Sequence, residues 1–299
     1  MGFDMEGGHA TVMSQSEGLA KVPSDLSGVP ETLLGNLNYR AVAARSRHPV
    51  LEDPKAIELV ERIDYPFEQF VGDRTGQRHA LRVRKFDEEI RRFLAEHPGG
   101  TVVALGEGLE TQFWRVDNGR VQWLTVDLPE PVNLRRQLLP DGPRRRTLAC
   151  SATDSQWMDH VDSSQGVMIT AQGLLMYLQP GEVDRLVDLC AQRFPGQSFL
   201  FDAVPAWIVA RQGRSDEHQH GAYQMAAWVW GVDAAERRRL GALPGVATFA
   251  ELRSTRGKGF FFGLVLPALR RVPKLRDYLP EFPVFRVQLA VNPASATHP

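Results

Sequence analysis

The chain has 299 residues, of which 43% are hydrophobic and 24% charged, so it can bury a sizeable core and is not a largely disordered chain. Its 35 Lys and Arg residues against 36 Asp and Glu residues give a net charge of −1, which argues against a protein dedicated to nucleic acid. Two cysteines, Cys150 and Cys190, exclude a disulfide framework and a cysteine-based zinc site.

The first third of the chain predicts an arm followed by helices. Residues 1–24 have no apolar run, and we expect a mobile arm there rather than a signal peptide. Residues 28–70 have helical spacing interrupted by prolines, which predicts two or three short helices. Residues 78–96 predict one strongly amphipathic helix. Since no stretch is long and apolar enough for a membrane span, we expect a cytoplasmic protein without a membrane partner.

After residue 100, short apolar runs alternate with helical patterns. The expected strands cover residues 101–105, 121–126, 147–149, 167–171 and 198–201, and the expected helices between them include 132–139 and 182–193. Strands and helices that alternate at this spacing are typical of an α/β fold with a mostly parallel sheet.

The alternation is interrupted over residues 205–258, where tryptophans and arginines predict a helical, lid-like insertion over the sheet. Residues 259–266 and 283–290 are expected to be the last two strands. The sequence thus predicts a single domain over residues 25–290 and a loose tail at 291–299.

The first expected strand runs into a glycine-rich turn. Gly106 and Gly108, with Glu107 between them, allow a tight turn and a close approach of a ligand to the backbone. Thr111 replaces the third glycine of the dinucleotide fingerprint, so the full motif is absent and a simple turn is an alternative. Asp127 ends the next strand, where its carboxylate can accept from both hydroxyls of an adenosine ribose or cap the following helix.

A third polar segment, Ser151 to Asp154, follows the third expected strand. The Asp154 carboxylate can accept a hydrogen bond from an adenine amino group or cap a turn. Because the carboxyl ends of parallel strands meet at one edge of a sheet, we expect the three segments to border one crevice.

Four motifs taken together resemble a known family. LGEGLETQFWR at 105–115, VDLPE at 126–130, SATDSQW at 151–157 and QGLLMYL at 172–178 resemble the leucine carboxyl methyltransferase family, in particular its bacterial, tetracenomycin-type polyketide O-methyltransferases. The resemblance extends over residues 30–290 and implies a class I S-adenosylmethionine-dependent methyltransferase fold, Rossmann-like with a mostly parallel seven-stranded sheet. It also implies S-adenosylmethionine as cofactor and S-adenosylhomocysteine as product.

The resemblance assigns site residues by position. Arg82 would bind the cofactor carboxylate, since a guanidinium can donate two parallel hydrogen bonds to it, although a solvated helix face is the alternative. The remaining cofactor-binding positions are Gly106 and Gly108 in the loop, Asp127 and Leu128 beside the ribose, Ser151, Ala152 and Asp154 near the adenine, and Gln172.

Two of these positions depart from the family pattern. The family usually has Glu where this chain has Gln172, and often an acidic residue where it has Ser151. If position 172 meets the cofactor ammonium, the amide keeps an acceptor but loses a charged hydrogen bond, which is worth about 1.5–3 kcal/mol. These departures keep a non-catalytic, cofactor-binding member of the fold as an alternative. Glu107 adds a carboxylate to the loop.

The acceptor follows from the chemistry and from the resemblance. A carboxylate, with a pKa of about 4, is ionised at pH 7, whereas a phenol, with a pKa of about 10, benefits from a base. No strong base signature is present, because His218 and His220 are better explained as a solvated loop than as a base or metal site. We therefore expect an O-methyltransferase acting on a carboxylate, or else a hydroxyl, of a small polyketide-like molecule.

Tyr177 and Trp228 are the candidate acceptor-binding residues, with core packing as their alternative role. Methylation of a protein C-terminal carboxylate, as in the eukaryotic branch of the family, is the alternative reaction. No metal is expected, and the motifs leave the oligomeric state open.

Overall fold

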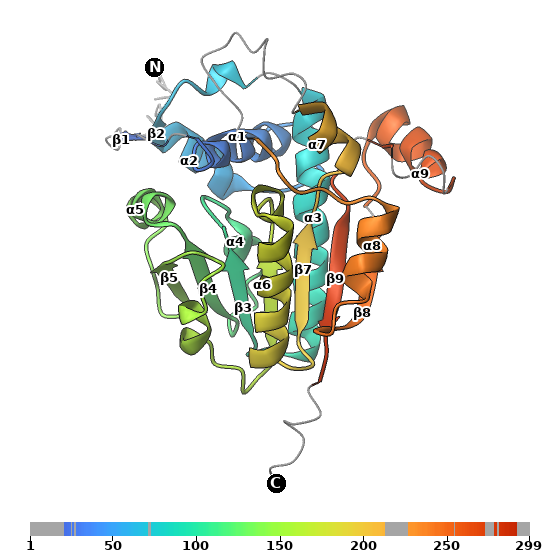
Figure 1. Cartoon of the computed structure of the whole chain (residues 1–299). Helices are drawn as coiled ribbons and strands as arrows, with labels where there is room; N and C mark the ends of the chain where they lie inside the picture. Colours follow the sequence, from blue (N-terminus) through green and yellow to red (C-terminus); the bar gives the residue numbers. More distant parts are fainter. Residues whose placement is uncertain are drawn as a thin grey trace, which may run out of the picture.

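In the computed structural model, residues 21–24, 26, 28–70, 73–212, 227–253, 255–272, 278–279 and 281–291 are described. Strands form a seven-stranded sheet in the order β5-β4-β3-β6-β7-β9-β8 (Figure 1). The strands are β3 (Thr101–Leu105), β4 (Gln122–Asp127), β5 (Arg145–Ala149), β6 (Val167–Ala171), β7 (Ser198–Asp202), β8 (Val246–Glu251) and β9 (Val284–Leu289). The pairs from β5 to β7 are parallel, and β9 is antiparallel to both of its neighbours. This topology confirms the predicted class I methyltransferase fold.

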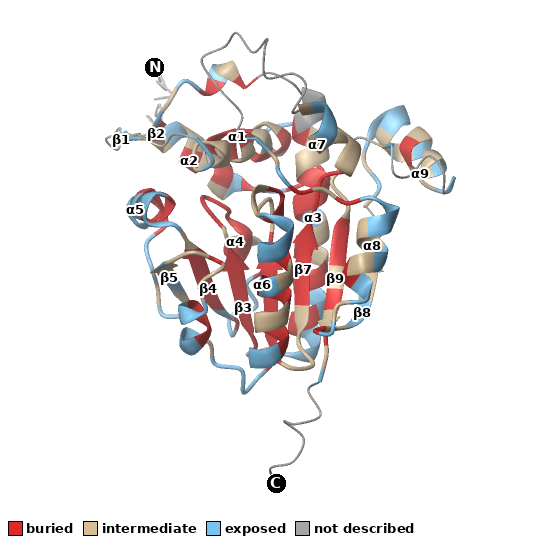
Figure 2. Ribbon diagram, in the orientation of Figure 1, coloured by how far each residue is buried: buried red, intermediate tan, exposed pale blue. Residues whose placement is uncertain are grey.

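The central strands are buried on both faces, as their continuous apolar runs predict. Along β3, Val103 and Leu105 belong to one core cluster and Val102 and Ala104 to another, because successive side chains point to opposite faces. Helices α6 (Pro180–Arg193) and α8 (Ala234–Gly241) contribute to the first cluster, and α3 (Asp73–Glu96) and α4 (Gln112–Val116) to the second. Figure 2 shows the buried sheet between helices with exposed outer faces.

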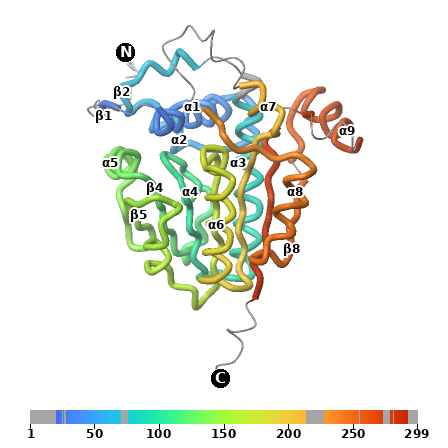
Figure 3. Tube along the Cα trace, viewed as in Figure 1, coloured from blue at the N-terminus to red at the C-terminus, as the bar shows by residue number. Residues whose placement is uncertain are grey.

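The predicted short helices precede the sheet. Helices α1 (Thr32–Ala44) and α2 (Pro54–Arg62) lie across the carboxyl ends of the parallel strands (Figures 1 and 3). Helix α2 begins at Pro54 because the Asp53 side chain caps it, accepting a 3.0 Å hydrogen bond from the Ala56 amide. Because α1 and α2 cross this edge, they roof the crevice that the strand ends form.

The remaining elements connect these layers. They are the two-residue strands β1 (Val22–Pro23) and β2 (Ile63–Asp64), the 3₁₀ turns η1 (Phe67–Gln69), η2 (Gln156–His160) and η3 (Leu175–Tyr177), the helices α5 (Pro129–Leu138), α7 (Ala206–Gln212) and α9 (Leu266–Leu269), and the π-helical turn η4 (Phe261–Val265). Among the described residues, none of the helices combines the length and apolar character needed to cross a membrane.

Two expectations near the C-terminus are wrong. Residues 259–266 are helical rather than a strand: η4 passes directly into α9, with Phe260 76% and Leu264 63% exposed. On the side of β9 away from β7, the pairing strand is β8. This strand lies inside the segment 205–258 that was expected to be helical. A short apolar run does not distinguish a strand from a helix, and β8 is an edge strand with a weak apolar signal. The predicted arm, up to residue 20, and the tail after residue 291 lie outside the described residues.

Candidate active site

The glycine loop turns where β3 ends. Gly106 and Gly108 have φ values of +62° and +53°, a region that favours glycine, and the Gly106 amide donates to the Val126 carbonyl at 2.8 Å. A Cβ on Gly106 would lie 2.9 Å from the Leu174 side chain, and one on Gly108 would lie 3.1 Å from Leu33. Both glycines are therefore required by the backbone and by the close approach of neighbouring elements.

A cavity of about 290 Å³ opens beside this loop, roofed by α1. It is lined by most of the predicted cofactor-binding residues, namely Arg82, Gly106, Gly108, Asp127, Leu128, Ser151, Ala152 and Gln172, and also by Tyr177. The crevice expected from the strand ends is thus present. Hereafter it is called the cofactor cavity.

Asp127 connects the glycine loop to the end of β4. Its Oδ2 accepts a 2.7 Å hydrogen bond from the Gly108 amide, and its Oδ1 accepts a 2.8 Å bond from the Leu128 amide. Helix α5 begins at Pro129 with Leu128 in the capping position, so Asp127 does not act as its N-cap. Burial raises the pKa of Asp127, while the two amides oppose that shift. The carboxylate fixes the loop and keeps lone pairs for hydroxyl donors of a ligand.

The adenine-side segment is only partly in place. Ser151 and Ala152 line the cofactor cavity, whereas Asp154 is not among the lining residues. The Asp154 Oδ1 instead accepts a 3.0 Å hydrogen bond from the Gln156 amide, which is the turn-capping alternative. Its role toward an adenine amino group stays a prediction.

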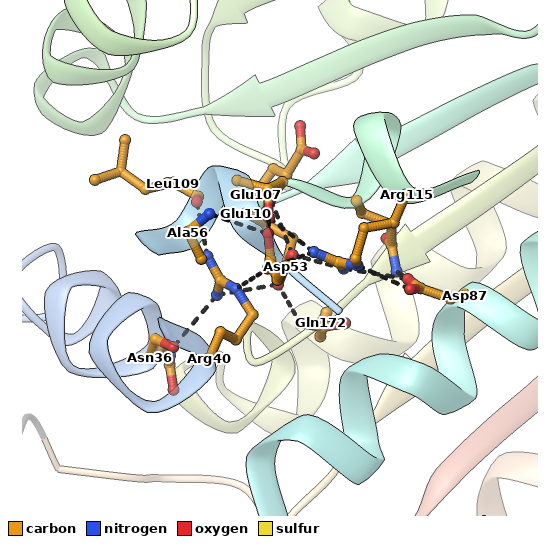
Figure 4. Close-up of polar contacts among 12 residues, drawn as sticks. Asn36, Arg40, Asp53, Ala56, Asp87, Glu107, Leu109, Glu110, Arg115 and Gln172 are labelled. Atoms are coloured by element: carbon orange, nitrogen blue, oxygen red, sulfur yellow. Dashed lines mark hydrogen bonds and ion pairs between the residues drawn. The ribbon is translucent and has the colours of Figure 1, made fainter. Parts of the chain in front are cut away.

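A buried charged cluster lies between the loop and α1 and was not foreseen from the sequence (Figure 4). The Arg40 Nη1 lies 3.1 Å from Glu110 Oε2, and its Nε lies 3.3 Å from Asp53 Oδ2. The Arg115 guanidinium contacts Asp53, Asp87 and Glu110, each at 2.8 Å. Although burial opposes it, the guanidinium groups of Arg40 and Arg115 lower the pKa of Glu110. Three carboxyl groups thus face two guanidinium groups, so the cluster is negative overall when all five are ionised.

Gln172 joins this cluster to the cofactor cavity. Its Nε2 donates to Glu110 Oε2 at 2.9 Å, and its buried Oε1 has no hydrogen-bond partner among the described residues (Figure 4). An unpaired buried acceptor is costly unless a ligand supplies a donor. Gln172 carries no charge, but its amide is hydrogen-bonded to the Glu110 carboxylate, which lines the same cavity.

Glu107, the extra loop carboxylate, is engaged by side chains of β4 and α5. It lies 3.0 Å from the Arg135 Nη2 and accepts hydrogen bonds from Thr125 and from the Trp123 indole at 3.2 Å. Burial raises the pKa of Glu107, and Arg135 opposes this shift. These contacts hold the loop against β4.

Arg82 lies at the junction of the cofactor cavity with a second cavity. Its Nη1 donates to Asp202 Oδ2 at 2.8 Å, and the other Asp202 oxygen accepts a 2.6 Å bond from the Gly173 amide. The guanidinium is buried rather than solvated, and its Nε has no hydrogen-bond partner in the described part of the chain. Arg84 is on the outer face of α3, paired with Glu88. The neighbouring Asp202 was not predicted as a site residue from the sequence.

The second cavity has a volume of about 360 Å³ and is called the acceptor cavity. It shares Arg82, Gly173 and Tyr177 with the cofactor cavity, and aromatic side chains form much of its wall. The wall includes Tyr39, Phe70, Trp228 and Phe282. The predicted Trp228 packs edge-on against Phe282 with ring centroids 6.0 Å apart, and its buried indole nitrogen has no hydrogen-bond partner within the ranges that the structure describes.

His79 also lines the acceptor cavity and was missed by sequence reasoning, although it precedes Arg82 by one helical turn. Its ring stacks on Tyr39 at 4.8 Å, and its Nδ1 lies 3.3 Å from the Arg82 Nη2. Burial, reinforced by Arg82, Arg78 and Arg40, lowers the pKa of His79 well below its usual range. The lowered pKa favours the neutral imidazole. His218 and His220 lie outside the described residues.

These features fit S-adenosylmethionine. The glycine loop leaves room for a nucleoside at the strand ends, the Asp127 carboxylate suits ribose hydroxyls, and the orphaned Gln172 Oε1 suits an ammonium donor. Within the described part of the chain, no group of three or more His, Cys, Asp or Glu residues is arranged to hold a metal ion.

Comparisons with known proteins agree with this geometry. The family model described as leucine carboxyl methyltransferase matches residues 34–191. The tetracenomycin polyketide synthesis O-methyltransferase TcmP of Streptomyces glaucescens is 36% identical over 189 residues, which cover 62% of this chain and 69% of that protein. An S-adenosyl-L-methionine-dependent methyltransferase of Gibberella zeae, dpfgK, is 30% identical over 187 residues, which cover 56% of this chain and 62% of that protein.

Among solved structures, a Synechocystis magnesium protoporphyrin IX methyltransferase aligns over 73% of this chain and 88% of its own, with a TM-score of 0.45 and 10% identity. The family assignment rests on the sequence matches and not on this likeness. The chain belongs to the leucine carboxyl methyltransferase family and is an S-adenosylmethionine-dependent methyltransferase.

Proposed function

We propose that this enzyme methylates a carboxylate of a small, flat, polyketide-like molecule bound in the acceptor cavity. The observation that carries the proposal is the junction of the two cavities at Arg82, Gly173 and Tyr177. Aromatic walls favour a planar ligand, and Arg78 in the same wall favours an anionic one. The name of the relative TcmP, which mentions polyketide synthesis, supports the same acceptor class.

The cofactor would occupy the first cavity. Its carboxylate is assigned to Arg82, whose Nε is free to donate, its ribose to Asp127 and Leu128, and its ammonium to Gln172 backed by Glu110. Gly106 and Gly108 give the backbone space for it, and Ser151 and Ala152 border the adenine side. Bound S-adenosylmethionine supplies a methyl group on a positively charged sulfur.

A carboxylate acceptor needs no proton transfer. In the displacement one S–C bond breaks and one C–O bond forms, which leaves a neutral ester and a neutral thioether. A phenol would have to lose a proton, and the one imidazole among the described lining residues of the acceptor cavity, His79, has a lowered pKa and accepts protons poorly. The protein's part is then to orient the acid and exclude water.

The segment 205–258 contributes directly to the acceptor cavity. Ile208 from α7 and Trp228 both line it. The chain next to Trp228 is tied to η3, because the Met176 carbonyl accepts from the amides of Val229 and Trp230 at 2.8 and 3.2 Å. Together with Tyr177 these residues form the proposed acceptor contacts.

A matched pair of acceptors tests the proposal. The enzyme is incubated with methyl-labelled S-adenosylmethionine and either 2-naphthoic acid or 2-naphthol, which share one ring system. We expect label in a base-labile ester of the acid, and Trp228→Ala should raise the KM for the acid without changing the affinity for S-adenosylhomocysteine. Label found only in a base-stable ether of the naphthol would overturn the carboxylate assignment.

A further inference from the structure

A cavity rich in arginine lies outside the two cavities described above. It has a volume of about 540 Å³ and is bordered by α8, the end of β8 and α9, at the edge of the sheet where α9 stands apart (Figure 1). Five arginines line it, namely Arg237, Arg253, Arg256, Arg270 and Arg271. It is called the basic cavity below. It adjoins the acceptor cavity, because Glu281 lines both.

The two glutamates of the basic cavity are already engaged. Glu251 accepts a 2.9 Å hydrogen bond from the Arg237 Nε, and Glu281 accepts a 2.6 Å bond from the Arg270 Nε. In contrast, the side chains of Arg253, Arg256 and Arg271 have no hydrogen bond or ion pair within the part of the chain that the structure describes. Among the described lining residues, two carboxylates against five guanidinium groups leave an excess of three positive charges.

This arrangement differs from the rest of the surface. Exposed arginines on other elements, such as Arg120, Arg146 and Arg185, do not line any described cavity. Like charges that share one concave wall repel each other, and a bound anion relieves that repulsion. Planar guanidinium forks match the oxygens of phosphate groups, with which they form charge-assisted, paired hydrogen bonds.

We propose that the basic cavity is a second ligand site, which binds a multiply charged phosphate-type anion through Arg253, Arg256 and Arg271. The three unneutralised charges favour a di- or triphosphate group over a single carboxylate, and the cavity is larger than the cofactor cavity. The site shares no lining residue with the cofactor cavity, and the proposal does not rest on the proposed methyl transfer.

Titration calorimetry with tripolyphosphate at constant ionic strength tests this site. The triple variant Arg253→Gln, Arg256→Gln and Arg271→Gln is compared with the control Arg120→Gln, Arg146→Gln and Arg185→Gln, which removes the same charge from exposed positions elsewhere. We expect saturable binding by the wild type, a loss of at least about tenfold in the site variant, and a change of less than about twofold in the control.

An equal loss in both triple variants would show general surface charge instead of a site, and absence of saturable binding by the wild type would also overturn the proposal. Thermal unfolding and S-adenosylhomocysteine binding by each variant report whether the fold and the cofactor cavity are intact. Should the site triple variant fail to fold, the single Arg256→Gln variant is titrated in its place. It should lose about threefold, whereas Arg185→Gln should lose nothing.

Discussion

Gln172 donates its side-chain amide to Glu110 across 2.9 Å, so an amide at this position satisfies a buried carboxylate. Glu110 is buried, paired with Arg40 and Arg115, and has a lowered pKa. A carboxylate at position 172 would face this carboxylate, and both guanidinium groups are already shared among three acids. The negative charge of the site is therefore held by Glu110, which lines the cofactor cavity beside Gln172.

The first prediction is that Gln172→Glu does not improve the enzyme. The new carboxyl faces Glu110, so its pKa in the folded state is raised above the value of about 4.3 in the unfolded chain. A raised acid pKa destabilises the folded state. The loss of stability is absent below about pH 4, grows as the pH rises from there to the folded-state pKa, and is constant above it. We expect a loss of about 1–2 kcal/mol in the free energy of unfolding at pH 8, measured by urea denaturation, and a smaller loss at pH 5.

The exposed Gln137 on α5 provides the control, because Gln137→Glu makes the same chemical change away from the cluster. It should change the stability by less than about 0.5 kcal/mol at both pH values. Tighter S-adenosylhomocysteine binding by Gln172→Glu, without a pH-dependent loss of stability, would show that Glu110 exerts no such repulsion.

The second prediction concerns Asp127, whose two oxygens accept from the amides of Gly108 and Leu128. In Asp127→Asn one acceptor becomes a donor that faces an amide N–H, so the glycine loop shifts and a ribose acceptor is lost. S-adenosylhomocysteine affinity should fall by about tenfold to a hundredfold, as measured by calorimetry. Asp154→Asn, outside the cavity lining, should leave it unchanged, whereas a comparable loss there would restore the predicted adenine-side role of Asp154.

The third prediction tests the pair formed by Arg82 and Asp202. Both side chains are at most 5% exposed, so Asp202→Asn leaves a buried guanidinium without its counter-charge. Such a loss costs about 3–5 kcal/mol of unfolding free energy when the partner is removed outright, and somewhat less when the amide keeps an acceptor. The exposed pair of Arg193 and Asp159 is the control, and Asp159→Asn should cost no more than about 1 kcal/mol. Equal losses of unfolding free energy in the two variants would mean that burial does not make the Arg82–Asp202 pair more important for stability than an exposed pair.

Much of the fold and part of the site were predictable from local pattern. The strands β3 and β6 have the expected bounds, because fully buried parallel strands read as unbroken apolar runs. Gly106 was recognisable because a turn directly after such a strand needs a positive φ. Asp127 was recognisable because it ends the neighbouring strand.

What the sequence does not encode locally are contacts between distant segments. Arg40 donates to the Leu109 carbonyl, 69 residues away, and Arg82 meets Asp202 across 120 residues. No spacing rule joins such pairs before the topology is known. Residues 259–266 are helical rather than extended for another reason. The place beside β9 that the predicted strand would have taken is occupied by β8, which no local pattern in residues 259–266 reveals.

The fourth prediction uses the buried imidazole of the acceptor cavity. Burial and the neighbouring arginines lower the pKa of His79 in the folded state, whereas the unfolded chain has a histidine pKa of about 6.5. Below that pH the unfolded state binds a proton that the folded state does not, so stability falls as the pH falls. The contribution of His79 should be about 1.4 kcal/mol for each pH unit below about 6. Urea unfolding between pH 7.5 and pH 5 measures it as the difference between the wild type and His79→Gln, while His160→Gln, at an exposed position, should follow the wild type. Parallel pH profiles for all three proteins would show that His79 takes up its proton in the folded state, in which case a phenol acceptor would have an effective base beside it.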